Sequence, residues 1–252
     1  MNESIAGIIH VHSSFSRDGA CSIADLTRYA REAGFRFVAL TDHAEDLSAA
    51  QALRLRAECE ACSDESCVVI PGLEFVCSDD IHILGLGVSA HIPDSDPVRV
   101  AATIRAWGGL AIFAHPVRSN YQCPPALCGV LDGIEIWNAR YDGRFVPAFP
   151  NFHLLQQARR SNAFLIGFGG PDFHRLDSPP EVITRLRVNG NVRVDSRTVL
   201  QHLRSGNFAV GVGHVRFNGR GGPRAHALFP LWALRKLYEI SKGLRDLGSG
   251  NS

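Results

Sequence analysis

The chain has 252 residues, 45% hydrophobic and 20% charged, so it can bury a sizeable core in one large domain. The formal net charge of +1 gives no reason to expect stable binding of nucleic acid through bulk electrostatics. No apolar run reaches the ~20 residues that a membrane-spanning helix needs. The N-terminus does not resemble a signal peptide, so we expect a cytoplasmic protein.

Short apolar runs rich in β-forming residues alternate with helical stretches along the first 215 residues. The predicted strands cover residues 4–12, 37–41, 67–75, 81–88, 110–114, 133–137 and 164–168. The predicted helices cover residues 22–33, with Ser22 as a cap, and 48–62, 97–107 and 152–160. This alternation favours an α/β fold, either a parallel barrel or a doubly wound sheet.

Residues 216–252 are predicted to form a basic C-terminal extension to a body of residues 1–215. From His214 onward there are seven Lys or Arg residues and two Asp or Glu residues. Apolar residues recur there at spacings of three and four, which predicts an amphipathic helix. They are Leu234, Leu237, Ile240, Leu244 and Leu247. This helix either packs on the body or contacts a partner or a membrane surface.

The counts of lysine and cysteine exclude several chemistries. The only lysines are Lys236 and Lys242, which excludes a GxxxxGK phosphate loop, and a Schiff-base or carboxylated lysine in the main body. The seven cysteines suggest no disulfide framework and fit a reducing compartment. Cys59 and Cys62 form a CxxC motif without a second one to complete a zinc ribbon, so we interpret them as ordinary thiols.

Histidines and carboxylates gather where predicted strands end. His10 and His12 lie two residues apart in the first strand, so their imidazoles share one face and can bind the same metal ion. Further candidates occur in or just after later strands, and in a barrel the loops at the C-terminal ends of the strands build the active site. They are His43, Glu74, His82, His115, Asp172 and His174.

Six motifs in fixed order carry a family resemblance: HVHSSFSRDG, TDH, PGLEF, HILG, AHP and PDFH. Together they resemble the signature of the PHP (polymerase and histidinol phosphatase) superfamily over roughly residues 5 to 215. One departure is Pro171, where the family often has Ser or Asn. The resemblance implies a distorted (β/α)7 TIM-like barrel that binds up to three metal ions and hydrolyses phosphate esters.

The same resemblance implies three groups of metal ligands. His10, His12, Glu74 and Asp172 would hold one ion. Glu74 would bridge to a second ion held by His82 and His115. Asp18, His43 and His174 would hold a third.

The donor types predict the chemistry of such a centre. Imidazole and carboxylate ligands without thiolates suit Zn, Mn or Fe. A net positive centre attracts phosphate, and a metal-bridged hydroxide is the expected nucleophile. Arg118, Arg140 and Arg175 follow predicted ligands or strand ends, and a guanidinium there can bind the phosphate oxygens.

Other polar residues have less specific interpretations. Asp42 is expected to support a ligand rather than bind metal, and Glu135 either supports a ligand or lies inside the barrel. Five histidines match no motif, although the glycines around His214 would allow a ligand to approach the backbone. They are His91, His153, His202, His214 and His226.

The expected function is hydrolysis of a small phosphomonoester or a nucleotide. Two alternatives stay open: a 3′–5′ exonuclease or oligonucleotide phosphodiesterase, and a non-catalytic module that binds metal. The negative charge of the body and the lack of a basic, aromatic-rich stripe disfavour the nuclease. The full set of candidate ligands disfavours the non-catalytic module.

Overall fold

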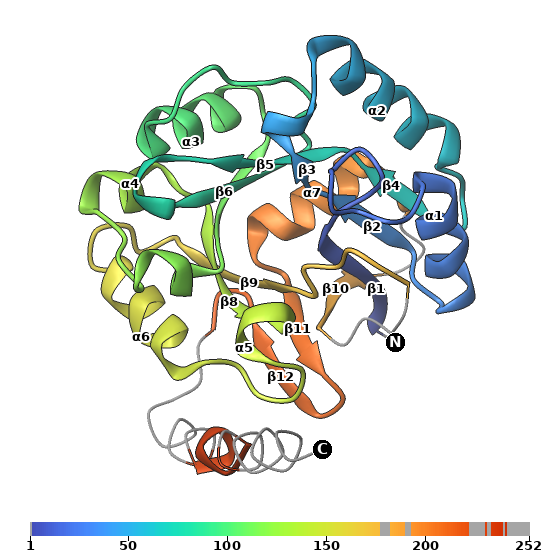
Figure 1. Ribbon diagram of the computed structural model, residues 1–252. Helices are drawn as coiled ribbons and strands as arrows, with labels where there is room; N and C mark the ends of the chain where they lie inside the picture. Colours follow the sequence, from blue (N-terminus) through green and yellow to red (C-terminus); the bar gives the residue numbers. More distant parts are fainter. Residues whose placement is uncertain are drawn as a thin grey trace, which may run out of the picture.

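The computed structural model describes residues 2–176, 182–189, 193–221, 230, 233–238 and 240. Within them, the strands pair into two sheets (Figure 1). The order in the first sheet is β12 (Val215–Asn218), β11 (Phe208–Val212), β10 (Ile183–Asn189), β1 (Asn2–Val11), β2 (Phe37–Leu40) and β4 (Val68–Ile70). The order in the second is β3 (Asp42–His43), β5 (Gly72–Val76), β6 (His82–Leu86), β7 (Leu110–Ala114), β8 (Gly133–Asn138) and β9 (Ile166–Gly170).

The helices connect these strands, and in Figure 1 α1, α2, α3, α4 and α6 lie on the outside of them. Their bounds are α1 Ile23–Glu32, α2 Ala49–Cys62, α3 Pro97–Ala106, α4 Pro125–Val130, α5 Ala139–Asp142, α6 Phe149–Ala158 and α7 Ser196–Ser205. Short 3-10 turns are η1 Ala44–Asp46, η2 Ser78–Asp80 and η3 Pro116–Ser119. The predicted cap is confirmed, because the Ser22 side chain accepts a hydrogen bond from the Asp25 amide at the start of α1.

Both sheets mix parallel and antiparallel pairs, which confirms the α/β fold but corrects the expectation of purely parallel strands. β6 runs antiparallel to both β5 and β7, and β10 runs antiparallel to β1. The predicted strand at residues 67–75 is also two strands in different sheets. Pro71 separates β4 from β5, because proline lacks the amide hydrogen that a continuous ladder needs.

The two sheets meet along two seams. Thr41 lies between β2 and β3, and its amide donates to the Val11 carbonyl. Val11 also forms an isolated parallel bridge with Phe173, just after β9. Gly167 of β9 also donates to the carbonyl of Gly219, just after β12, at 2.8 Å. Since no ladder in the described part of the chain joins the sheets, the closed barrel stays a prediction.

One hydrophobic core joins the two sheets and the helices around them. Its largest fully buried side chains come from strands of both sheets. They include Phe37 of β2, Phe113 of β7, Trp137 of β8, Phe168 of β9 and Phe208 of β11. This core holds the ends of the strands in place, and these ends position the polar side chains described below.

Residues 233–238 of the C-terminal segment are helical, but the predicted apolar stripe does not pack on the body there. Leu234, Leu237 and Ile240 are exposed, and Leu244 and Leu247 lie outside the described residues. The helix instead contacts the body through Tyr238, whose ring lies next to Phe145, and through Arg235, which donates to the Val146 carbonyl at 3.3 Å. In the described residues, every helix is too short or too polar to span a bilayer.

Candidate metal centre

The end of β1 places two imidazoles in the interior. His10 adopts a positive φ of 64°, and the register between β1 and β2 shifts between Ile9 and Val11. This irregularity is a bulge, which re-aims side chains where a strand ends. Both His10 and His12 are fully buried, with ring centroids 5.4 Å apart. The two predicted ligands therefore lie side by side, although the strand is not regular at this point.

The structure brings all nine predicted metal ligands together in overlapping groups. Within each group the ligand atoms lie within 4.8 Å of one another. The groups are His10, His12 and Glu74; Glu74, His82 and His115; His10, His115 and Asp172; and His12, Asp18, His43 and His174.

Glu74 lies at the centre of the buried groups. Its Oε1 is 2.7 Å from His82 Nδ1 and 2.9 Å from His115 Nε2. Its Oε2 faces the first pair of imidazoles, 3.5 Å from His10 Nε2 and 3.3 Å from His12 Nε2. One carboxylate thus faces two sets of histidines from its two oxygens, which is the geometry expected of a bridging ligand.

His82 reaches this centre from the start of a strand. It is the first residue of β6, and it pairs in register with Ala114 at the end of β7. Because the two strands are antiparallel, the start of β6 and the end of β7 lie at the same edge of the sheet. The rule that ligands follow the C-terminal ends of strands therefore does not apply to His82.

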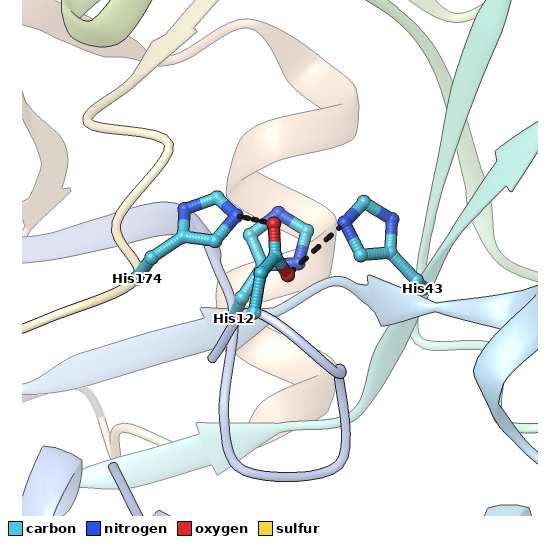
Figure 2. A group of neighbouring side chains, drawn as sticks. His12, His43 and His174 are labelled. Atoms are coloured by element: carbon cyan, nitrogen blue, oxygen red, sulfur yellow. Dashed lines mark ion pairs between the residues drawn. The ribbon is translucent and has the colours of Figure 1, made fainter. Parts of the chain in front are cut away.

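The group that contains Asp18 lies nearer to solvent. Figure 2 shows His12, His43 and His174 arranged around a carboxylate. Asp18 supplies this carboxylate, with Oδ1 3.4 Å from His43 Nε2 and Oδ2 3.1 Å from His174 Nε2. Its side chain is 44% exposed, so this edge of the centre is open to a substrate.

Two sets of hydrogen bonds orient the first pair of histidines. Glu135 is buried, with Oε1 3.0 Å from His10 Nδ1, while Oε2 accepts from the His115 amide at 2.9 Å. Ser16 Oγ lies 3.3 Å from His12 Nδ1 and donates to Asp42 at 2.7 Å. These contacts at Nδ1 leave Nε2 of both rings facing the centre. Glu135 and Asp42 thus support candidate ligands, as the sequence indicates for Asp42 and as one of its two interpretations of Glu135.

Burial and charge shift several pKa values in the centre. Burial alone would raise the pKa of Glu74, but its contacts with His10 and His115 lower it well below the usual value. Burial alone would lower the pKa of His12, but the neighbouring carboxylates of Asp172 and Glu74 raise it to about 9. Protonated imidazoles therefore balance these carboxylates, and a divalent cation would replace those protons when it binds.

Several imidazole nitrogens in the centre are buried without a hydrogen-bond partner. An unpaired buried polar atom is costly, so these atoms favour a further ligand. They are His10 Nε2, His12 Nε2, His43 Nδ1, His82 Nε2 and His115 Nδ1. Together with the carboxylate oxygens they are suitable donors for a metal ion, and the residues present fit the predicted cofactor.

The three predicted substrate-binding arginines differ in their surroundings. Arg140 Nη1 lies 2.9 Å from the His174 ring nitrogens and 4.0 Å from Asp172, and its side chain is 49% exposed. Arg118 instead donates two hydrogen bonds to Asp80. Arg175 is exposed. Of the three, Arg140 combines contacts to two candidate ligands, His174 and Asp172, with a side chain that is about half exposed.

Sequence reasoning did not single out Asp80 and Tyr141 at the rim. Asp80 lies 3.4 Å from His82 Nε2, and its position two residues before His82 was the available signal. The Tyr141 ring lies 4.8 Å from the His115 ring, and its hydroxyl accepts from Arg118 at 3.2 Å. These two side chains hold Arg118 against the rim.

The remaining histidine and cysteine candidates lie apart from the centre. His214 is exposed in the turn between β11 and β12. His91 and His153 are exposed and His202 is half-buried, while His226 lies outside the described residues. Cys59 and Cys62 join no potential metal-binding group in the part of the chain that the structure describes.

Comparison with known proteins gives one family match and several structural relatives. Residues 9–167 match the PHP domain family. A protein from Bifidobacterium adolescentis, named as a proposed metal-dependent phosphoesterase, shares 18% identity with a TM-score of 0.51, covering 82% of this chain and 97% of its own. PsfC from Pseudomonas syringae shares 15% identity with a TM-score of 0.55, covering 96% and 99%. At these identities the likeness shows a shared fold. No curated protein matched the sequence.

Proposed function

Because the chain belongs to the PHP domain family, we propose that it hydrolyses a small phosphomonoester or a nucleotide at a centre of two or three divalent metal ions. The match to this family confirms the resemblance that the motifs carry, and with it the hydrolase class that they predict. The observation that carries the proposal is the convergence of nine His, Asp and Glu side chains in groups whose ligand atoms lie within 4.8 Å.

The proposed ligand assignment follows these groups. His10, His12, Glu74 and Asp172 would hold the first ion. Glu74 would also contribute to the second, with His82 and His115. The more exposed group of Asp18, His43 and His174 would hold the third. The contacts of both Glu74 oxygens support its role as the shared ligand.

Divalent ions bound there would supply an acidified water as the nucleophile and neutralise charge on the phosphoryl oxygens. The protein side chains define where the phosphate binds. Three carboxylates facing up to three divalent cations leave a net positive centre, which attracts an anion. Arg140 borders its open edge beside His174 and can donate two parallel hydrogen bonds to phosphate oxygens. Mixed imidazole and carboxylate donors suit Zn, Mn or Fe.

We also propose that the two sheets together correspond to the distorted (β/α)7 barrel of the family. The two seams, at Thr41 and at the Val11–Phe173 bridge, support this proposal because they bring the sheet edges together. Residues 1–215 would form the catalytic body and residues 216–252 the basic extension. The pairing of β12 with β11 extends the sheet to Asn218.

Chelation is the decisive test of this function. Purified protein should lose hydrolysis after exhaustive chelation and regain it with Mn²⁺ or Zn²⁺, measured on phosphomonoesters, nucleotides and short oligonucleotides. We expect the highest kcat/KM on a small phosphomonoester or nucleotide. Hydrolysis that persists after verified metal removal would contradict the proposal, and preference for oligonucleotides would favour the exonuclease alternative.

The role of Arg140 is tested by Arg140→Ala. Loss of a charged hydrogen bond to phosphate should raise KM by about 10- to 100-fold, which corresponds to roughly 1.5–3 kcal/mol. The matched control is Arg99→Ala, because Arg99 is an exposed arginine of α3 that pairs with Asp94. Equal KM values in both variants would remove Arg140 from the site.

A further inference from the structure

Two cysteines outside the metal centre lie in contact. Cys123 precedes α4 and Cys128 lies within it, and their sulfur atoms are 2.9 Å apart. A disulfide bond is about 2.05 Å long, so a small approach of the two sulfurs would allow a bond to form. Local structure holds this arrangement, because the Cys128 amide donates to the Pro124 carbonyl at 3.0 Å as the helix begins.

A pocket of about 430 Å³ gives small molecules access to this pair. Cys123 and Cys128 both line it, together with Tyr121, Gln122 and Gln157. Cys123 is the more accessible thiol, whereas Cys128 is buried. The hydrogen bond between the thiols lowers the pKa of Cys128 and raises that of Cys123 well above the usual range. Once Cys128 has ionised, transfer of the Cys123 proton to it across the short contact gives a thiolate at the accessible Cys123, and an accessible thiolate is the nucleophile of thiol–disulfide exchange.

We propose that Cys123 and Cys128 are a redox pair that small-molecule disulfides, such as oxidised glutathione, convert to an intramolecular disulfide. The Cys123 thiolate attacks one sulfur of the oxidant, which forms a mixed disulfide and releases one small thiol. The Cys128 thiolate then attacks the Cys123 sulfur and displaces the second small thiol. The two cysteines together lose two electrons and two protons, and the oxidant is reduced to two thiols.

Three other cysteines have surroundings that oppose this chemistry. Burial raises the pKa of Cys67 to about 11 and that of Cys77 to about 12. It also raises the pKa of Cys59, a member of the CxxC motif, well above the usual range. These thiols stay protonated near neutral pH, so they provide an internal comparison for the pair.

Tryptic peptides separate the two sets of cysteines. Cleavage after Arg118 and Arg140 gives a peptide of residues 119–140 that contains Cys123 and Cys128. Cleavage after Arg56 and Arg99 gives a peptide of residues 57–99 that contains Cys59, Cys62, Cys67 and Cys77. The full-length protein is equilibrated with reduced and oxidised glutathione, denatured in acid, alkylated, digested and analysed by mass spectrometry.

We expect the 119–140 peptide to lose both alkylation sites and two hydrogen atoms as the oxidised fraction of glutathione rises, while Cys59, Cys67 and Cys77 of the 57–99 peptide stay alkylated. In Cys128→Ser, the mixed disulfide on Cys123 should accumulate because nothing displaces it. Two alkylated cysteines in the 119–140 peptide at every glutathione ratio would overturn the proposal. Glutathione retained on Cys123 of the unmodified chain, or a bond to another cysteine, would overturn it equally.

Discussion

The metal centre and the end of α5 both bury a carboxylic acid, but the pKa is lowered at the first place and raised at the second. Glu74 lies among imidazoles, and its contacts with them lower its pKa well below the usual value. Asp142 accepts hydrogen bonds from the Asn138 amide and the Asn151 side chain, and burial raises its pKa to about 7. Burial alone therefore does not indicate a metal ligand, whereas burial among imidazoles does.

Asp18 adds a third environment to this comparison. It has imidazole neighbours like Glu74, but 44% of its side chain is exposed. Burial opposes ionisation of Asp18, whereas the nearby His174 and His43 favour it. The pKa of Asp18 is lowered as a result. Replacing each acid by its amide leaves the shape of the side chain nearly unchanged and removes the charge. The three amide variants therefore separate the contribution of imidazole neighbours from that of burial.

The largest effect is expected for Glu74→Gln. The variant keeps one acceptor oxygen but removes the negative charge that both buried groups share. It should release more metal than any single histidine substitution, and activity should fall by more than about 100-fold. Elemental analysis and turnover measure both effects, with circular dichroism as the check on folding. Full metal content in Glu74→Gln would show that this residue is not a shared ligand.

A smaller effect is expected for Asp18→Asn. Asp18 contacts only the more exposed group, through His43 and His174, so at most one ion per chain should be lost. Activity should fall by about 10- to 100-fold, while the ions held through Glu74 remain. Metal analysis of both variants in parallel gives the comparison. Equal metal loss from Asp18→Asn and Glu74→Gln would mean that the groups bind cooperatively and are not separable.

The sequence predicted the candidate ligands because short motifs carry them. His10 and Glu74 lie in strands that apolar runs mark clearly, and His12 directly follows the first of these strands. The sequence did not predict the direction of β6. Parallel and antiparallel strands have the same apolar pattern. The sequence could therefore place His82 in a strand, but it could not show that the start of this strand lies at the metal centre.

Contacts between distant residues were the least predictable part. Glu135 lies within 3.0 Å of His10 across 125 residues of sequence, so no local pattern could choose between its two interpretations. The Cys123–Cys128 pair has no recognised motif. Cys59 and Cys62 do form a CxxC motif, but they join no potential metal-binding group in the described residues. Asp142 follows Tyr141 in a short helix, and no local pattern predicts the hydrogen bond that it accepts from Asn151 of the next helix.

The smallest effect on activity is expected for Asp142→Asn, which should instead change how stability depends on pH. The folded protein retains the Asp142 proton up to a pKa of about 7, whereas the unfolded chain loses it near pH 4. Between these values the folded state binds more protons. The free energy of unfolding should therefore fall as pH rises through this range, by up to about 4 kcal/mol from this group.

The amide introduced by Asp142→Asn would carry no such proton, and its carbonyl oxygen can still accept the hydrogen bonds from Asn138 and Asn151 that Asp142 Oδ2 accepts. Denaturant unfolding at about pH 4.5 and about pH 8 should show Asp142→Asn gaining stability relative to the unmodified protein as pH rises. Every other titratable group is the same in the two proteins, so its contribution cancels in the difference. Parallel pH dependences would mean that Asp142 is ionised in the folded state and that burial does not set its pKa.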